Sequence, residues 1–198
     1  MRDVRNIKAV AALGADIIGL IFYPKSPRYV GEQTVALPTG IDYAGVFVDE
    51  KTDVILQRVR AYSLAYVQLH GCEDAEYVEL LRRRLPKEVK IIKAISIGQN
   101  HGTFNWQSYV GLADILLFDT QCVGYGGSGE KFDWQWLDKY NGVLPFLLSG
   151  GIGPEDAELI KSFRHPRCIG VDLNSRFESA PAVKDIELLR DFISMIDN

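Results

Sequence analysis

The chain has 198 residues, of which 47% are hydrophobic and 24% are charged, and its formal net charge is −4 at pH 7. This composition is typical of a globular protein and excludes a disordered, collagen-like or coiled-coil chain. The mild acidity argues against a dedicated nucleic-acid binder, which usually carries a basic excess. The sequence contains no apolar run of the roughly 20 residues that a membrane span needs, and no signal-peptide core. We therefore expect one domain over residues 1–198, without nucleic-acid or membrane partners.

Short apolar runs alternate with amphipathic segments along the whole chain. Strands are predicted at residues 17–23, 44–48, 66–69, 90–95, 115–118, 145–148 and 168–172. Helices are predicted at residues 4–13, 31–36, 53–62, 75–85, 106–112, 134–139, 155–163 and 186–196. Several strands are apolar on both faces, which is typical of strands buried in a parallel sheet.

This alternation predicts an α/β fold with helices outside a parallel sheet, which closes either as a (β/α)8 TIM barrel or as an open doubly wound sheet. The barrel is favoured because no G-x-G-x-x-G motif follows an early strand. A complete barrel has eight strands. We therefore expect a barrel whose strand 1 is missing or incomplete in this chain, with the missing piece just before Met1.

Polar residues follow nearly every predicted strand, at the end where (β/α)8 enzymes carry their chemistry. Asp119 follows the strand at 115–118, where a partly desolvated carboxyl would suit a general acid, although it could instead hydrogen-bond loop backbone. His70 follows the strand at 66–69 and would either contact a ligand or be satisfied by backbone. The histidines lack metal-ligand spacing, so no metal site is expected.

Two later loops carry the residues expected to bind a phosphate. Gly150 and Gly151 follow the strand at 145–148, and Asn174 and Ser175 follow the last predicted strand. Glycine lets backbone N–H groups approach an anion closely, and these loops often bind phosphate in (β/α)8 enzymes. The alternative is that the glycines only turn the chain into its next helix.

Arg28 lies in a proline-restrained loop, where it would either clamp a carboxylate or be an ordinary surface residue. The three cysteines, Cys72, Cys122 and Cys168, are widely spaced without a C-x-x-C pair, which indicates reduced thiols and a cytoplasmic protein. Cys72 and Cys122 are interpreted as loop residues rather than nucleophiles, and Cys168 as a core residue at the opposite end of the barrel.

Taken together, these strand-end motifs resemble the phosphoribosylanthranilate isomerase family of tryptophan biosynthesis. The matching stretches are GADIIGLIFYPKSPRYV, GVFVDE, VQLHG, IKAI, LLFDT with GGSGEKFDW, PFLLSGGI, and GVDLNSRFE followed by KD. They occur in the family's order and cover nearly the whole chain. FYPKSPRYV, the DT unit with GGxGxxFDW, and VDLNSRFE are specific to it.

The resemblance implies an Amadori rearrangement of a phosphosugar-anthranilate substrate that needs neither cofactor nor metal. Asp119 would be the acid that protonates the furanose ring oxygen, and Arg28 would hold the anthranilate carboxylate. Gly150, Gly151, Asn174 and Ser175 would bind the phosphate. His70 and Asp172 would lie near the ribose or shape the pocket. Both a monomer and a homodimer are compatible with a single barrel.

One family feature falls outside the sequence. The family's base cysteine ends the first strand, in a Lys-x-Cys-Gly stretch directly before the segment that matches residues 1–3. We therefore expect the chain as given to be impaired. The alternatives are a non-catalytic phosphosugar-binding barrel and, less well matched, a relative of indole-glycerol-phosphate synthase, for which no catalytic lysine pattern is present.

Overall fold

A computed structural model of the protein describes residues 1–31, 36–97, 105–120 and 134–197. The strands are β1 (Ile17–Ile21), β2 (Asp42–Phe47), β3 (Tyr66–Leu69), β4 (Lys90–Ile97), β5 (Ile115–Thr120), β6 (Phe146–Leu148), β7 (Cys168–Val171), β8 (Glu178–Ala180) and β9 (Val183–Lys184). The α-helices are α1 (Val4–Ala11), α2 (Thr52–Tyr62), α3 (Ala75–Arg84), α4 (Ala157–Ser162) and α5 (Ile186–Asp197). Short 3-10 helices occupy Gln107–Tyr109, Trp134–Lys139, Pro154–Asp156 and Ser175–Phe177.

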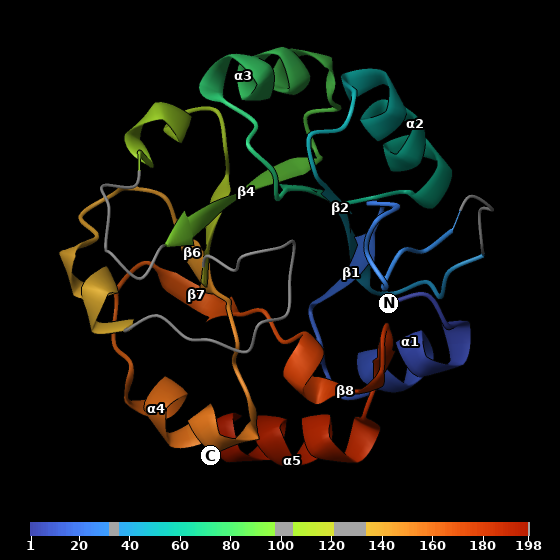
Figure 1. The fold of residues 1–198 in the computed structure, drawn as a ribbon, viewed down its shortest axis with the longest axis vertical. Helices are drawn as coiled ribbons and strands as arrows, with labels where there is room; N and C mark the ends of the chain where they lie inside the picture. Colours follow the sequence, from blue (N-terminus) through green and yellow to red (C-terminus); the bar gives the residue numbers. More distant parts are fainter. Residues whose placement is uncertain (32–35, 98–104, 121–133, 198) are drawn as a thin grey trace.

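The main sheet confirms the predicted fold class. Its seven strands run parallel in the order β1-β2-β3-β4-β5-β6-β7, so that each strand pairs with the next one along the chain. Viewed along their common axis, the strands curve round a centre and the helices lie outside them (Figure 1). This is the architecture of a (β/α)8 barrel, of which the described residues supply seven strands.

Three segments predicted as helices do not form α-helices in the described residues. The segment 106–112 forms only a 3-10 turn at Gln107–Tyr109, because Gly111 (φ +82°) ends any continuing helix. The segment 134–139 is also a 3-10 helix rather than an α-helix. Residues 31 and 36 are not helical, and the rest of the helix predicted at 31–36 lies outside the described residues. The antiparallel β8–β9 hairpin was not predicted.

The two faces of the sheet are packed differently. The inner face carries a small apolar cluster of Ile92, Ala94, Ile115 and Leu117, with Tyr66 and Leu147 against it. The outer face meets the helices in a larger core, whose fully buried side chains include Phe47, Phe118, Phe146, Phe177 and Phe192. Side chains two residues apart on a strand face the same side of the sheet. Gln68 and His70 therefore face inward like Tyr66, and Asp119 faces inward like Leu117.

A register shift separates the pairing of β6 and β7 into two parts. Phe146 pairs with Cys168, but Leu147 pairs with Gly170, so Ile169 has no partner in β6 and is 56% exposed. Such a bulge opposes two residues to one. Beyond it, Val171 packs against the outer core, which places Asp172 on the inner side.

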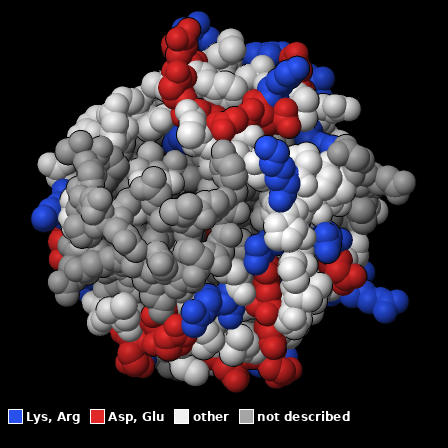
Figure 2. All heavy atoms as spheres, in the orientation of Figure 1, with Lys and Arg blue, Asp and Glu red and all other residues white. Residues whose placement is uncertain are grey.

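Figure 2 shows the molecule in the orientation of Figure 1, with basic and acidic side chains interspersed over the described part of this face. None of the helices described here is both long enough and apolar enough to span a bilayer.

Candidate active site at the carboxyl ends of the strands

The centre of the site is a contact between two predicted residues at the ends of β3 and β5, which are separated in the sheet by β4. His70 Nε2 lies 3.0 Å from Asp119 Oδ2, and the side chains are 29% and 21% exposed. Asp119 belongs to the end of β5, where it pairs in register with Ser96 of β4, and His70 directly follows β3. The carboxyl and the imidazole are therefore partly shielded from water but still open to a ligand.

Gln68 orients this histidine from the interior of the barrel. Its Nε2 lies 2.9 Å from Nδ1 of His70, and the residue is 8% exposed. When the Gln68 amide donates to Nδ1, the imidazole proton must be on Nε2, from which it is donated to Asp119. Gln68 thus fixes the tautomer that delivers a hydrogen bond to the carboxylate.

Asp172 forms a second carboxyl position on the same inner side. Its Oδ2 accepts a hydrogen bond of 3.1 Å from Ser149 Oγ, and its backbone N–H donates to the carbonyl of Leu148. Burial raises the pKa of Asp172, and the Asp119 charge adds to this, while the Lys184 charge opposes it. Asp172 is therefore close enough to both Asp119 and Lys184 for their charges to act on its carboxyl.

The predicted phosphate loops follow β6 and β7 side by side in the sheet. Gly150 (φ +88°) and Gly151 (φ +69°) both adopt the left-handed conformation that favours glycine. Asn174 and Ser175 stand at the start of a short 3-10 helix after β7. Among the described residues, the backbone N–H groups of these four residues have no hydrogen-bond acceptor. The two loops can therefore offer several backbone donors to one anion.

Arg28 is held at the edge of the site by a buried carboxylate. Its Nε donates to Glu178 Oε2 at 2.8 Å and Oε1 at 3.0 Å, and its Nη2 lies 2.7 Å from Oε2. Lys184 Nζ contacts Glu178 Oε1 at 3.3 Å and both the carbonyl and the side-chain oxygen of Asn174 at 2.9 Å. Through Glu178 and Lys184, Arg28 is therefore linked to the predicted phosphate loop that contains Asn174.

A second buried ion pair supports the loop after β3. Lys93 Nζ donates to Glu73 Oε2 and to the Gly71 carbonyl, both at 2.8 Å, and the two side chains are at most 3% exposed. Glu73 also accepts from the N–H groups of Asp49 (2.9 Å) and Gly71 (3.0 Å). A Cβ on Gly71 would lie 2.7 Å from the Asp49 nitrogen, so only glycine fits there. The pair therefore fixes the backbone directly after His70.

The remaining candidates lie away from this centre. Cys168 begins β7 at the opposite end of the barrel, and Cys72 is exposed on the loop after His70. Cys122 and the glycine-rich stretch at residues 124–129 lie outside the described residues. In the described ranges, no group of three or more His, Cys, Asp or Glu residues could hold a metal ion.

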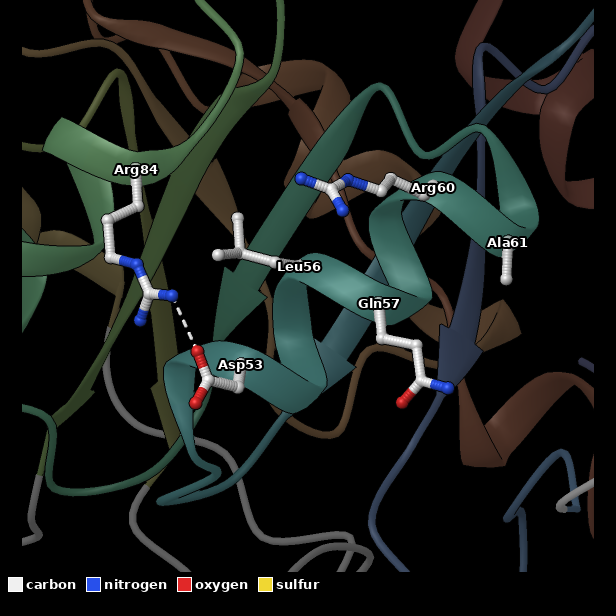
Figure 3. Close-up of a pocket in the computed structure, with 6 residues that line it drawn as sticks. All are labelled: Asp53, Leu56, Gln57, Arg60, Ala61 and Arg84. Carbon is white, nitrogen blue, oxygen red and sulfur yellow. Dashed lines mark hydrogen bonds and ion pairs between the residues drawn. The ribbon is translucent and has the colours of Figure 1, made fainter.

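One surface pocket, of about 470 Å³, lies on the outer side of the barrel. It is lined by Asp53, Leu56, Gln57, Arg60 and Ala61 of α2 and by Arg84 of α3. Arg84 reaches across to Asp53 at 2.5 Å (Figure 3). Because the pocket is on the helical side of the sheet, it is separate from the polar residues at the strand ends.

Sequence reasoning gave no role to Gln68, Glu178 or Lys184. Gln68 could have been found from its position two residues before His70, since alternate residues of a strand face the same side. Glu178 and Lys184 lie within the quoted stretches VDLNSRFE and KD. Their contacts with Arg28 and Asn174 depend on the β8–β9 hairpin, for which we identified no sequence signal.

Comparisons with known proteins cover nearly the whole chain. The family model described as N-(5'phosphoribosyl)anthranilate (PRA) isomerase matches residues 1–195. The N-(5'-phosphoribosyl)anthranilate isomerase of Parabacteroides distasonis is 44% identical over 202 residues, which cover 99% of this chain and 90% of that relative.

Solved structures match along the entire chain. The phosphoribosyl anthranilate isomerase of Thermotoga maritima is 30% identical with a TM-score of 0.79, and the match covers 100% of this chain and 95% of that one. A further structure has a TM-score of 0.74 at 28% identity, with the same coverage of both chains. It holds the enzyme in complex with reduced 1-(o-carboxyphenylamino)-1-deoxyribulose 5-phosphate.

Proposed function

This chain belongs to the N-(5'-phosphoribosyl)anthranilate isomerase family, and we propose that the residues at its strand ends carry out the family's isomerisation. The reaction is an intramolecular aldose-ketose rearrangement in tryptophan biosynthesis. Neither the expected impairment nor the alternative of a non-catalytic phosphosugar-binding barrel finds support in the comparisons. We place the reaction in the cytoplasm.

Asp119 is the general acid of this proposal. It donates a proton to the furanose ring oxygen while the bond between that oxygen and C1′ breaks, and the anthranilate nitrogen forms a Schiff base with C1′. The observation that carries this assignment is the contact of 3.0 Å between His70 Nε2 and Asp119 Oδ2. His70 donates to one carboxyl oxygen, so the proton to be transferred is directed to the other.

The rearrangement is completed when C2′ loses a proton to a base, and the resulting enolamine gains a proton at C1′ and loses the proton of its C2′ hydroxyl, which yields the ketose. We assign this base to neither Cys72 nor Cys168. Cys168 is at the wrong end of β7, and Cys72 is exposed on the loop beyond His70. Asp172 stands on the inner face beside Ser149, where we expect it to contact ribose hydroxyls.

The two ends of the substrate are held by opposite charges and donors. The phosphate is bound by the backbone N–H groups of Gly150, Gly151, Asn174 and Ser175, which are unpaired among the described residues. The anthranilate carboxylate is bound by Arg28, whose guanidinium can form paired hydrogen bonds with a carboxylate. No external oxidant or reductant is needed, because C1′ is reduced while C2′ of the same substrate is oxidised, so the proposal requires only proton donors and acceptors.

The test is turnover of N-(5'-phosphoribosyl)anthranilate, followed by the loss of anthranilate-type fluorescence. Asp119→Asn keeps the shape and the hydrogen bond from His70 but cannot donate the proton. We expect kcat to fall by about 10²–10⁴-fold, with binding of the reduced product analogue nearly unchanged. Retained turnover in this variant would remove Asp119 from the acid role. Tight binding of the analogue without turnover by the wild type would favour a non-catalytic barrel instead.

A further inference from the structure

Glu178 makes the closest contacts with the residue proposed to bind the substrate carboxylate. Its side chain is 4% exposed, and both of its oxygens accept from Arg28, at distances between 2.7 and 3.0 Å. Burial alone would raise the pKa of Glu178, but the hydrogen bond and charge of Arg28 and the charge of Lys184 outweigh it. The pKa is therefore lowered and the carboxylate stays ionised.

The contact uses only one edge of the guanidinium. An arginine side chain has two edges that can each bind a carboxylate, one formed by Nε and Nη2 and the other by Nη1 and Nη2. Glu178 occupies the Nε edge. Within the described ranges, Nη1 of Arg28 donates no hydrogen bond. Arg28 can therefore bind a second carboxylate while Glu178 remains in place.

Glu178 is itself fixed by the hairpin that contains it. The Ala182 N–H donates to its Oε1 at 3.2 Å, and Lys184 Nζ approaches the same oxygen at 3.3 Å. The Lys184 backbone is in turn bound on both sides by the Asn6 side chain, at 2.7 and 2.8 Å. The orientation of Glu178 is thus set by β8, β9 and α1 together, and no ligand is needed to establish it.

We infer that Glu178 is a positioning residue, which holds Arg28 so that its free edge faces the carboxylate on the aromatic ring of the substrate. The inference rests on the proposed function, because it takes the anthranilate carboxylate as the occupant of that edge. A flexible arginine would lose rotamer freedom each time it bound the substrate. Glu178 imposes this order before the substrate arrives, which favours binding.

The experiment compares two ligands in wild-type protein and in Glu178→Gln. One ligand is reduced 1-(o-carboxyphenylamino)-1-deoxyribulose 5-phosphate, and the other is its phenylamino counterpart without the carboxyl group. We expect the variant to bind the first ligand roughly 10–100-fold more weakly, the range for a charge-assisted hydrogen bond. Binding of the second ligand should change by less than about 2-fold. An equal loss for both ligands would overturn the positioning role.

Kinetics supply the second readout. Glu178→Gln should raise KM while kcat stays close to the wild-type value, because the carboxylate contact is present in both the ground state and the transition state. In an Arg28→Met background, Glu178→Gln should no longer alter the preference for the carboxylated ligand. A fall in kcat without a rise in KM, or an unchanged effect in that background, would contradict the inference.

The matched control is Glu79→Gln, which removes the carboxylate of an exposed ion pair with Arg83 on α3. It should leave binding of both ligands unchanged. A charge-keeping variant, Glu178→Asp, guards against a simple folding defect and should lose affinity only for the carboxylated ligand. Failure of the wild type to turn over substrate and to bind either ligand would refute the proposed function itself. Normal wild-type turnover with an equal loss in Glu178→Gln would refute only the role of Glu178.

Discussion

Two buried ion networks lie at different positions around the mouth of the barrel, and they differ in completeness. Beside β3 and β4, Lys93 and Glu73 direct their polar atoms at each other and at nearby backbone groups. Beside β1 and the β8–β9 hairpin, Arg28 and Glu178 leave one guanidinium edge without a partner among the described residues. A completed network fixes backbone, whereas an incomplete one can receive a ligand.

The largest expected effect on stability comes from breaking the completed network. Glu73→Ala leaves the Lys93 ammonium buried without its partner, and the free energy of unfolding should fall by about 3–5 kcal/mol. Urea denaturation measures this loss. The double variant Lys93→Met/Glu73→Leu buries no charge and should recover much of it. A loss below about 1 kcal/mol for Glu73→Ala would show that this pair is not a structural anchor.

Arg28→Met tests the incomplete network. Glu178 keeps Lys184 as a partner, so the stability loss should be smaller than for Glu73→Ala. The main effect should be on the substrate, with KM raised roughly 10–100-fold and kcat less affected. Steady-state kinetics beside urea denaturation separate the two effects. A stability loss equal to that of Glu73→Ala with unchanged KM would reverse the comparison.

Asp172 gives an intermediate case, since it has one hydroxyl partner and its carboxyl is desolvated. Burial raises its pKa above the ordinary value of 3.8, so the native state binds the proton more tightly than the unfolded state does. Its contribution to stability is therefore present below pH 3.8 and is lost as the pH rises through the raised pKa. Asp172→Asn should flatten this decline and gain stability relative to wild type at neutral pH. Parallel pH profiles of the two proteins would contradict the expected shift.

The smallest effect is expected at the exposed ion pair of the outer pocket. Asp53 is 82% exposed in its side chain and Arg84 is 39% exposed, so water and salt screen their attraction. Asp53→Asn should change the free energy of unfolding by about 0.2–1 kcal/mol. Thermal unfolding at low and high salt measures the difference. A loss comparable to that of Glu73→Ala would mean that burial does not distinguish the networks.

The strands and the polar residues that follow them could be predicted from the sequence alone, because both depend on local patterns. Apolar runs bounded by Asp, His and Gly predicted all seven barrel strands, and the placement of Asp119 and His70 followed from them. The short 3-10 segments were harder, because a single turn carries too few residues for a helical period. The segment at 106–112 is such a case, since Gly111 interrupts it.

Long-range contacts account for what sequence reasoning missed. Glu178 and Arg28 are 150 positions apart, and no local pattern indicates that one carboxylate would engage that arginine. Gln68 is different, because its spacing from His70 already indicated the same face of β3. The contact between Glu178 and Arg28 became visible only when the hairpin was placed beside the strand ends.

The unpaired Ile169 in β7 has a consequence for how the gene can change. Removing its codon would leave Gly170 opposite Leu147 and Val171 opposite Leu148, so Asp172 would still face inward. β5 has no such extra residue in its pairing with β4, where every position from Ile115 to Thr120 has a partner. Loss of one codon there would turn Asp119 toward the helices. Two deletions of one codon each, in strands that are two apart in the sheet, would therefore differ in outcome. The deletion in β7 would keep its carboxylate inside the barrel, and the deletion in β5 would remove its carboxylate from the site.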